Sequence, residues 1–133
     1  MSAGEGSQGA VRALDDAPEM TWADERGKLR FRTVFGADTT TSQLVLGRCV
    51  IEPGEQLAYH SHEATEVYHI LTGRAELTLD GVVRSVRAGD SVFIPGRTPH
   101  GARSLGPEPL EIIYVYAADA ADGAATAYTM HER

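Results

Sequence analysis

The segment "GEQLAYHSHEATEVYHILTG", residues Gly54 to Gly73, joins strand-like alternation to a dense group of histidines. It holds three of the five histidines in the chain. On a β-strand, residues two apart share a face, with about 6.5–7 Å between their Cα atoms. His60 and His62 therefore point the same way, and Glu66 follows near the start of the next strand-like run. These residues are either a polar strand face or ligands aimed at one metal ion.

A fourth donor lies downstream in "FIPGRTPHGAR", residues Phe93 to Arg103, where two prolines shape a tight loop just before His100. Imidazole nitrogens and a carboxylate oxygen suit divalent first-row metals, at distances of roughly 2.0–2.2 Å. An isolated His-x-His pair is more often a polar strand face. His60 and His62 are therefore ligands only if the fold unites them with Glu66 and His100.

The sequence on both sides of this segment also alternates with period two. Short runs rich in β-branched or aromatic residues each end at Gly, Pro or Asp-Gly. The runs are "KLRFRTVFG", "SQLVLGRCVIEPG", "EVYHILTG", "RAELTLDG", "VVRSVRAGD", "SVFIPG" and "PLEIIYVYA". Asp80 and Gly81 indicate a hairpin, because both residues tolerate the positive φ of a tight primed turn. Eight or so short strands with almost no helical period predict an all-β, antiparallel sandwich or small barrel.

Length and charge exclude several classes of protein. With 133 residues the chain is long enough for one domain and too short for two. A net charge of −7 disfavours nucleic acid and anionic membranes as partners. No apolar run approaches the roughly 20 residues of a membrane span, and the first ten residues do not resemble a secretory signal. The single cysteine, Cys49, cannot form an internal disulfide, which fits a cytoplasmic protein.

The two ends of the chain are weakly patterned. Residues 1–18 are small, polar and rich in glycine and alanine, which predicts a flexible N-terminal tail. Residues 119–133 are rich in alanine and aspartate and are expected to form a C-terminal tail. The β-barrel domain is therefore expected to span residues 19–118.

Both histidine segments resemble the two sequence motifs of the cupin superfamily. The first motif is glycine, five residues, H-x-H, three or four residues, glutamate, six residues and glycine. The chain matches every fixed position with Gly54, His60, His62, Glu66 and Gly73.

The second motif is glycine, five residues, P-x-G, two residues, histidine, three residues and asparagine. Gly89, Pro95 and His100 match, whereas Arg97 replaces the second glycine and Ser104 replaces the asparagine. Both departures lie in the turn and its exit, so they bear on the shape of the loop. The resemblance covers about residues 43–116.

The resemblance implies a single-domain, antiparallel jelly-roll β-barrel with one divalent transition metal ion inside it (Fe, Mn, Ni or Zn). The implied ligands are His60, His62, Glu66 and His100. It also implies a small-molecule substrate and a homodimer that exchanges or packs N-terminal strands. The segment "GKLRFRTVFG", residues 27–36, is the candidate for that contact.

Tyr68 is the candidate catalytic residue. By strand parity Glu66, Tyr68 and Ile70 share one face, so Tyr68 should point toward the metal. A nearby divalent cation favours the phenolate, which would make Tyr68 a general base. A barrel-lining tyrosine with a hydrogen-bonded hydroxyl explains the same position equally well. The arrangement is similar to the cupin dimethylsulfoniopropionate lyases, in which a tyrosine two residues after the glutamate ligand is the proposed base.

We therefore expect a metal-dependent enzyme, of lyase or isomerase type, that acts on a small polar, carboxylated substrate by acid–base chemistry. An Fe(II)-dependent dioxygenase, which uses the same four ligands, is the first alternative. A non-catalytic binding or sensing cupin is the second. Its weakness is that the ligand set here is intact, whereas pure binders often lose a ligand.

Several other residues have more than one interpretation. His69 should face away from the metal, and Cys49 is expected to be a small buried hydrophobe. Arg48 either anchors a substrate carboxylate or is solvated. Tyr114 and Tyr116 share a face of the last predicted strand, which either lines the barrel or packs outside it.

Overall fold

The computed structural model describes residues 9–36, 41, 43–117 and 128–132. Within these residues a short 3-10 turn, Leu14–Asp16, precedes eleven strands. The strands are β1 (Glu19–Asp24), β2 (Gly27–Phe35), β3 (Leu44–Ile51), β4 (Gln56–Ser61), β5 (Glu66–Thr72), β6 (Arg74–Leu79), β7 (Val82–Arg87), β8 (Ser91–Ile94), β9 (His100–Ser104), β10 (Leu110–Ala117) and β11 (Thr129–Met130). The described residues contain no helix with the length and apolar character needed to cross a membrane.

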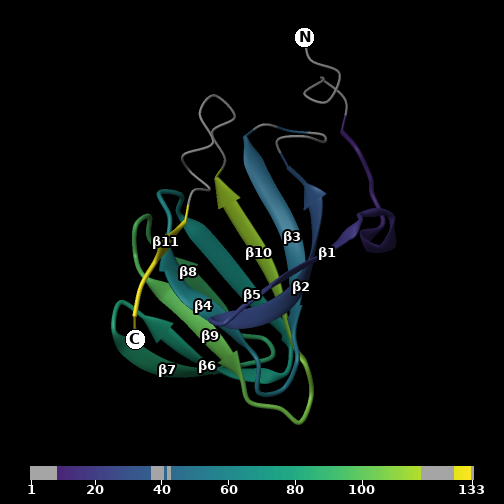
Figure 1. The fold of residues 1–133 in the computed structure, drawn as a ribbon. Helices are drawn as coiled ribbons and strands as arrows, with labels where there is room; N and C mark the ends of the chain where they lie inside the picture. The colour runs from purple at the N-terminus through teal and green to yellow at the C-terminus, as the bar shows by residue number, and fades with distance from the viewer. Residues whose placement is uncertain (1–8, 37–40, 42, 118–127, 133) are drawn as a thin grey trace.

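The strands form two antiparallel sheets that face each other (Figure 1). The six-stranded sheet has the order β1-β2-β3-β10-β5-β8, and the five-stranded sheet has the order β11-β4-β9-β6-β7. The predicted all-β, antiparallel jelly roll is confirmed. Strands β1 and β11 were not predicted, because both are largely exposed and lack apolar alternation.

The predicted hairpin at Asp80 and Gly81 joins β6 to β7. Leu79 pairs directly with Val82, so the connection has two residues. Asp80 has φ 49° and Gly81 has φ 80°, as a primed turn requires.

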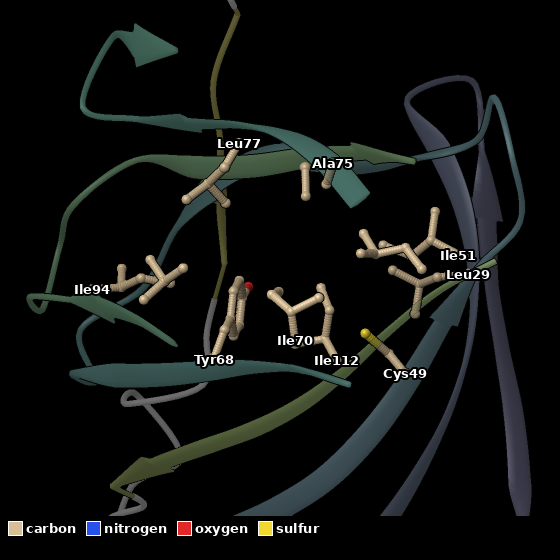
Figure 2. Close-up of a cluster of buried hydrophobic side chains, with 12 residues drawn as sticks. Leu29, Cys49, Ile51, Tyr68, Ile70, Ala75, Leu77, Ile94 and Ile112 are labelled. Carbon is tan, nitrogen blue, oxygen red and sulfur yellow. The ribbon is translucent and has the colours of Figure 1, made fainter. Parts of the chain in front are cut away.

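The core fills the space between the sheets. Strand β5 alternates buried and exposed positions along Glu66–Ile70, so its apolar side chains enter the core only on one face. Tyr68 stands there among aliphatic side chains contributed by both sheets (Figure 2). The fully buried aliphatic residues are Ile51, Ile70, Leu77, Ile94, Leu110 and Ile112. Each contributes about 1.5–3 kcal/mol by leaving water.

The predicted tails lie partly outside the described residues, namely at 1–8, 118–127 and 133. At the N-terminal side, Ala17 is fully buried and its carbonyl accepts a 2.5 Å hydrogen bond from Arg32. At the C-terminal side, Thr129 and Met130 pair with β4. The boundaries at residues 18 and 119 remain predictions.

Candidate metal centre

Three buried imidazoles meet inside the barrel. His60 lies on the inward-facing side of β4, His62 comes directly after that strand, and His100 is the first residue of β9. His60 and His100 are register partners across β4 and β9, with ring centroids 4.4 Å apart. The three side chains are 6%, 7% and 0% exposed, and one ligand atom of each lies within 4.8 Å of the others.

The backbone fixes the orientation of each ring. The Nδ1 atoms of His60, His62 and His100 lie 2.7, 3.0 and 2.8 Å from the carbonyl oxygens of Ala58, Ala64 and Thr98. A carbonyl only accepts hydrogen bonds, so Nδ1 carries the proton in all three rings. In the neutral rings each Nε2 therefore keeps its lone pair. Hydrogen bonds of this kind are the usual support of metal-binding histidines.

Glu66 reaches the same point from the opposite sheet. Its Oε1 lies 3.0 Å from His62 Nε2 and 3.3 Å from His100 Nε2. Burial alone would raise the pKa of Glu66, but the adjacent His100 and His62 side chains hold it below its ordinary value. The carboxylate is therefore ionised at neutral pH.

His60 is neutral at the same pH. Burial, and then the neighbouring His100, lower its pKa to about 4, although its hydrogen bond to the Ala58 carbonyl opposes the shift. Its Nε2 lone pair is therefore free to bind a cation.

The donor set fits a divalent first-row metal ion. Three imidazole nitrogens and one carboxylate oxygen are ligand types that Fe, Mn, Ni and Zn accept. His100 Nε2 is fully buried and makes no hydrogen bond to any described residue. A buried polar atom without a partner is costly, and a bound cation would remove that cost. The structure thus brings together all four residues that the two motifs single out.

A close contact between two loops holds the donors in place. The backbone N–H of Arg97 donates a 2.7 Å hydrogen bond to the carbonyl of His62. A Cβ on Gly96 would lie 2.3 Å from the carbonyl oxygen of Glu63, so only glycine permits this approach. Arg97 has φ 67°, the left-handed conformation that the glycine of the family motif adopts easily. The departure at Arg97 therefore preserves the shape of the turn.

Three of the four donors, His60, His62 and Glu66, line a cavity of about 180 Å³. Its walls are mostly aromatic and apolar, and no lysine or arginine of the described residues lines it. The lining residues are Trp22, Leu29, Phe31, Thr33, Cys49, Leu57, Ala58, His60, His62, Glu66, Tyr68, Tyr114, Tyr116, Tyr128 and Met130. Such a volume admits only a small molecule, because the pockets that hold drug-sized ligands start at about 300 Å³.

Tyr68 lies beside the donors, as strand parity predicts. It is 4% exposed, and its ring centroid is 5.9 Å from that of His100. Burial, and then the negative charge of Glu66, raise the pKa of Tyr68 well above its ordinary value. In the metal-free protein this side chain is therefore a neutral phenol.

The structure also places the other candidate residues. Tyr114 and Tyr116 line the cavity with stacked rings, their centroids 6.2 Å apart. Arg48 pairs with Glu111 instead of lining the cavity. His69 is exposed and lies 2.9 Å from Ser91 Oγ. Cys49 is buried, and burial raises the pKa of its thiol to about 12.

Sequence reasoning missed Tyr128, which lines the cavity close to two of the imidazoles. Its ring centroid lies 5.1 Å from that of His60 and 5.6 Å from that of His62. No local signal marks this residue, since its segment has neither apolar alternation nor a metal-ligand spacing. The pairing of β11 with β4 brings it there.

Comparisons with known proteins agree with this geometry. Residues 47–116 match the family described as "Cupin domain". The chain is 39% identical over 92 residues to the dimethylsulfoniopropionate lyase DddW of Ruegeria pomeroyi, a match that covers 68% of this chain and 60% of that one. It is 33% identical over 66 residues to a 5-nitrosalicylic acid 1,2-dioxygenase of Bradyrhizobium sp, which covers 50% of this chain and 32% of that one.

The fold is also found among solved structures. The polyketide cyclase RemF of Streptomyces resistomycificus superposes with a TM-score of 0.79 at 18% identity, over 95% of this chain and 87% of that one. At this identity the likeness concerns the fold alone. The chain spans less than two thirds of the length of the lyase and of the dioxygenase that it matches.

Proposed function

This chain belongs to the cupin family, and on that premise we propose that it is a metal-dependent lyase acting on a small carboxylated substrate. The observation that carries the proposal is the convergence of three buried imidazoles and the Glu66 carboxylate beside an inward-facing Tyr68. His60, His62, His100 and Glu66 would hold the ion. The bound ion would supply positive charge that polarises the substrate carboxylate and lowers the pKa of nearby phenols.

The cavity walls favour a substrate that carries a cationic group at the end opposite its carboxylate. Aromatic faces attract onium groups, and the buried carboxylate of Glu66 adds negative charge. The described lining offers no cationic side chain that would repel such a group. Dimethylsulfoniopropionate, the substrate named in the lyase relative, carries both a carboxylate and a sulfonium group.

In the reaction that we propose, Tyr68 acts as the general base through its phenolate oxygen. It takes the proton from the carbon next to the substrate carboxylate. The electron pair of that C–H bond forms a carbon–carbon double bond, and the carbon–sulfur bond breaks. Dimethyl sulfide leaves with the sulfur electron pair, and acrylate remains. An isomerase would use the same proton abstraction and return the proton to the substrate.

The test starts from metal-free protein reconstituted anaerobically with Fe(II), Mn(II), Ni(II) or Zn(II). We expect one ion per chain by elemental analysis and release of dimethyl sulfide from dimethylsulfoniopropionate. His62→Ala should lose the ion and the activity together, whereas His69→Ala, an exposed histidine, should lose neither. Full metal content in His62→Ala contradicts the ligand assignment. An ion bound without turnover of this substrate contradicts the lyase and favours a binding protein.

A dioxygenase is the second candidate, supported by the dioxygenase relative and by aromatic walls that suit an aromatic substrate. It would require iron and consume oxygen. Oxygen uptake by the Fe(II)-loaded protein on a hydroxylated benzoate, with no dimethyl sulfide from the lyase substrate, would favour it over the lyase.

We also propose that the protein is a cytoplasmic homodimer. The outer face of the six-stranded sheet carries a cross-strand row of Phe93, Val67, Val115 and Leu46, which are paired in register. Phe93 is 63% exposed and Val67 is 41% exposed. Strand β2, which lies in the N-terminal segment predicted to make this contact, pairs on both edges within its own chain, so its edges are not open to a second copy. The single buried cysteine supports a reducing compartment.

A further inference from the structure

The short strand β11 returns the chain to the metal-binding strand β4. Thr129 pairs with Ser61, and Met130 pairs with His60. Because side chains alternate along a strand, Tyr128 and Met130 share one face and His131 takes the other. Tyr128 and Met130 both line the cavity, so that face is the inner one.

His131 holds β11 against the outer side of β4. Its Nε2 lies 2.7 Å from the Ser61 hydroxyl, and its backbone N–H donates a 2.8 Å hydrogen bond to the carbonyl of Tyr59. The rings of His131 and Tyr59 are also in edge contact, with centroids 5.9 Å apart. Strand β11 has only two residues, so these contacts contribute much of its attachment.

Tyr128 differs in exposure from the rest of the aromatic lining. It is 57% exposed, although its ring contacts two imidazoles that are almost fully buried. Tyr128 therefore extends from the solvent to the rings of His60 and His62. The cavity aromatics Tyr68, Tyr114 and Tyr116 are buried or half-buried and form its inner walls.

From this geometry we propose that Tyr128 is the outer wall of the site: it shields the imidazoles and contacts the substrate from the solvent side. His131 is a positioning residue that acts through Tyr128. The substrate contact rests on the proposed function, whereas the shielding does not. An aromatic ring at this place adds a further face to the cavity that would receive an onium group.

The first experiment measures shielding in the metal-free full-length protein, without any substrate. Diethyl pyrocarbonate modifies unprotonated imidazole nitrogens, and peptide mass spectrometry gives the rate at each histidine. Tyr128→Ala should be modified severalfold faster than wild type at His60 and His62, relative to the exposed His69 in the same sample. Equal relative rates in the two proteins would overturn the proposal.

Three further variants separate shielding from general loosening. Tyr128→Phe keeps the ring and should match wild type. Thr129→Ala, on the opposite face of the same strand, should also match wild type. His131→Ala should increase the rates at His60 and His62, and His131→Gln, which keeps a side chain able to hydrogen-bond Ser61, should restore them. Acceleration by Thr129→Ala equal to that of Tyr128→Ala would mean that any disturbance of β11 suffices, which would overturn the specific role of the ring.

The second experiment measures the substrate contact in the reconstituted enzyme. Tyr128→Ala should raise KM for dimethylsulfoniopropionate roughly 10-fold while kcat stays near wild type, as loss of one aromatic contact to a cation predicts. An unchanged KM would overturn the contact. Failure of the proposed function would appear differently, as a wild-type protein without turnover, and the modification rates would still decide the shielding.

Discussion

Ser104, which stands where the cupin motif has asparagine, carries a buried hydroxyl without a partner. Its backbone is well paired, since its N–H donates to the carbonyl of Glu55 and its carbonyl accepts from Gly54. Its side chain is 1% exposed, and Oγ has no hydrogen-bond partner among the described residues. The hydroxyl is thus desolvated without compensation.

Replacing this hydroxyl should stabilise the fold. We expect Ser104→Ala to raise the free energy of unfolding by up to about 1 kcal/mol, because an unpaired buried hydroxyl is removed and little volume is lost. Urea denaturation of the metal-free protein measures the change. Ser61→Ala is the matched control: its hydroxyl bonds His131, so this variant should lose stability. A destabilised Ser104→Ala would mean that Oγ has a partner in solution.

A substitution at Tyr68 tests catalysis separately from metal binding. In the proposed reaction its oxygen takes the proton, whereas it is not among the proposed ligands. Tyr68→Phe should therefore keep one ion per chain and lower kcat by roughly 10²–10⁴-fold. Tyr116→Phe is the control, because it changes another phenol of the same cavity. A Tyr68→Phe enzyme with the wild-type rate would show that Tyr68 lines the cavity without acting as the base.

His60 makes the metal-free fold sensitive to acid. Its pKa is about 4 in the fold, below its ordinary value of 6.5, so the unfolded chain binds a proton first as the pH falls. Stability is therefore complete above pH 6.5 and declines toward pH 4, by at most about 3 kcal/mol from this group. Glu66, whose pKa is also lowered, adds a loss at still lower pH.

Urea denaturation at several pH values measures this slope. The variant His60→Gln cannot titrate at this position, so it should show a smaller decline between pH 6.5 and 4 than wild type. Parallel profiles for the two proteins would show that His60 is not the source of the decline.

At the scale of single elements, a glycine on β3 leaves room for a tyrosine side chain of the neighbouring strand β10. Gly47 and Tyr114 are register partners, and a Cβ on Gly47 would lie 2.3 Å from the tyrosine ring. The missing side chain therefore lets the ring lie close to β3 and form a wall of the cavity. Glycine weakens the interior of a strand, so the cost to β3 at this position is linked to the shape of the site.

Filling this position should disturb both stability and the site. We expect Gly47→Ala to destabilise the protein by roughly 1–3 kcal/mol, because the tyrosine ring must move within a packed interior. Thermal unfolding measures the loss. Combining it with Tyr114→Leu, which removes the ring, should give a smaller loss than the sum of the two single changes. Additive losses would show that the ring is not the obstacle.

Local pattern predicted most elements, and motif spacing predicted the donor group. The alternation around Glu66, Tyr68 and Ile70 correctly placed these side chains inside, and the two motifs correctly brought His100 to His60. Their roles as ligands and base remain predictions. Exposed strands β1 and β11 carry no such alternation, and whether Tyr114 faced inward depended on the pairing of distant strands. Contacts of this kind arise from tertiary packing, which a local pattern does not contain.

At the scale of the whole molecule, the two faces of the six-stranded sheet differ in what they contact. The inner face lines the site, whereas the outer face carries the apolar row of Phe93, Val67, Val115 and Leu46. An exposed apolar row of this kind is typical of a contact surface. Since the chain carries a net charge of −7, two copies repel each other unless an apolar contact offsets the repulsion.

The proposed homodimer can be tested on this row. We expect sedimentation equilibrium to give a dimer for wild type, and Phe93→Lys to weaken it at least about 10-fold, because burying an unpaired charge opposes association. Val83→Lys is the control, since Val83 is exposed on the other sheet. A monomeric wild type, or a Phe93→Lys dimer of unchanged affinity, would contradict this contact.

The donors come from both layers of the barrel: His60 and His100 belong to the five-stranded sheet, His62 directly follows its strand β4, and Glu66 belongs to the six-stranded sheet. An ion held by all four would therefore join the two layers at one point. Any opening motion that separates the sheets would have to release the ion first, and binding at 1,000 times Kd resists such release by about 4 kcal/mol. Loading should then slow amide hydrogen exchange in both β4 and β5, while the turn between β1 and β2, at the edge of the six-stranded sheet, continues to exchange as before.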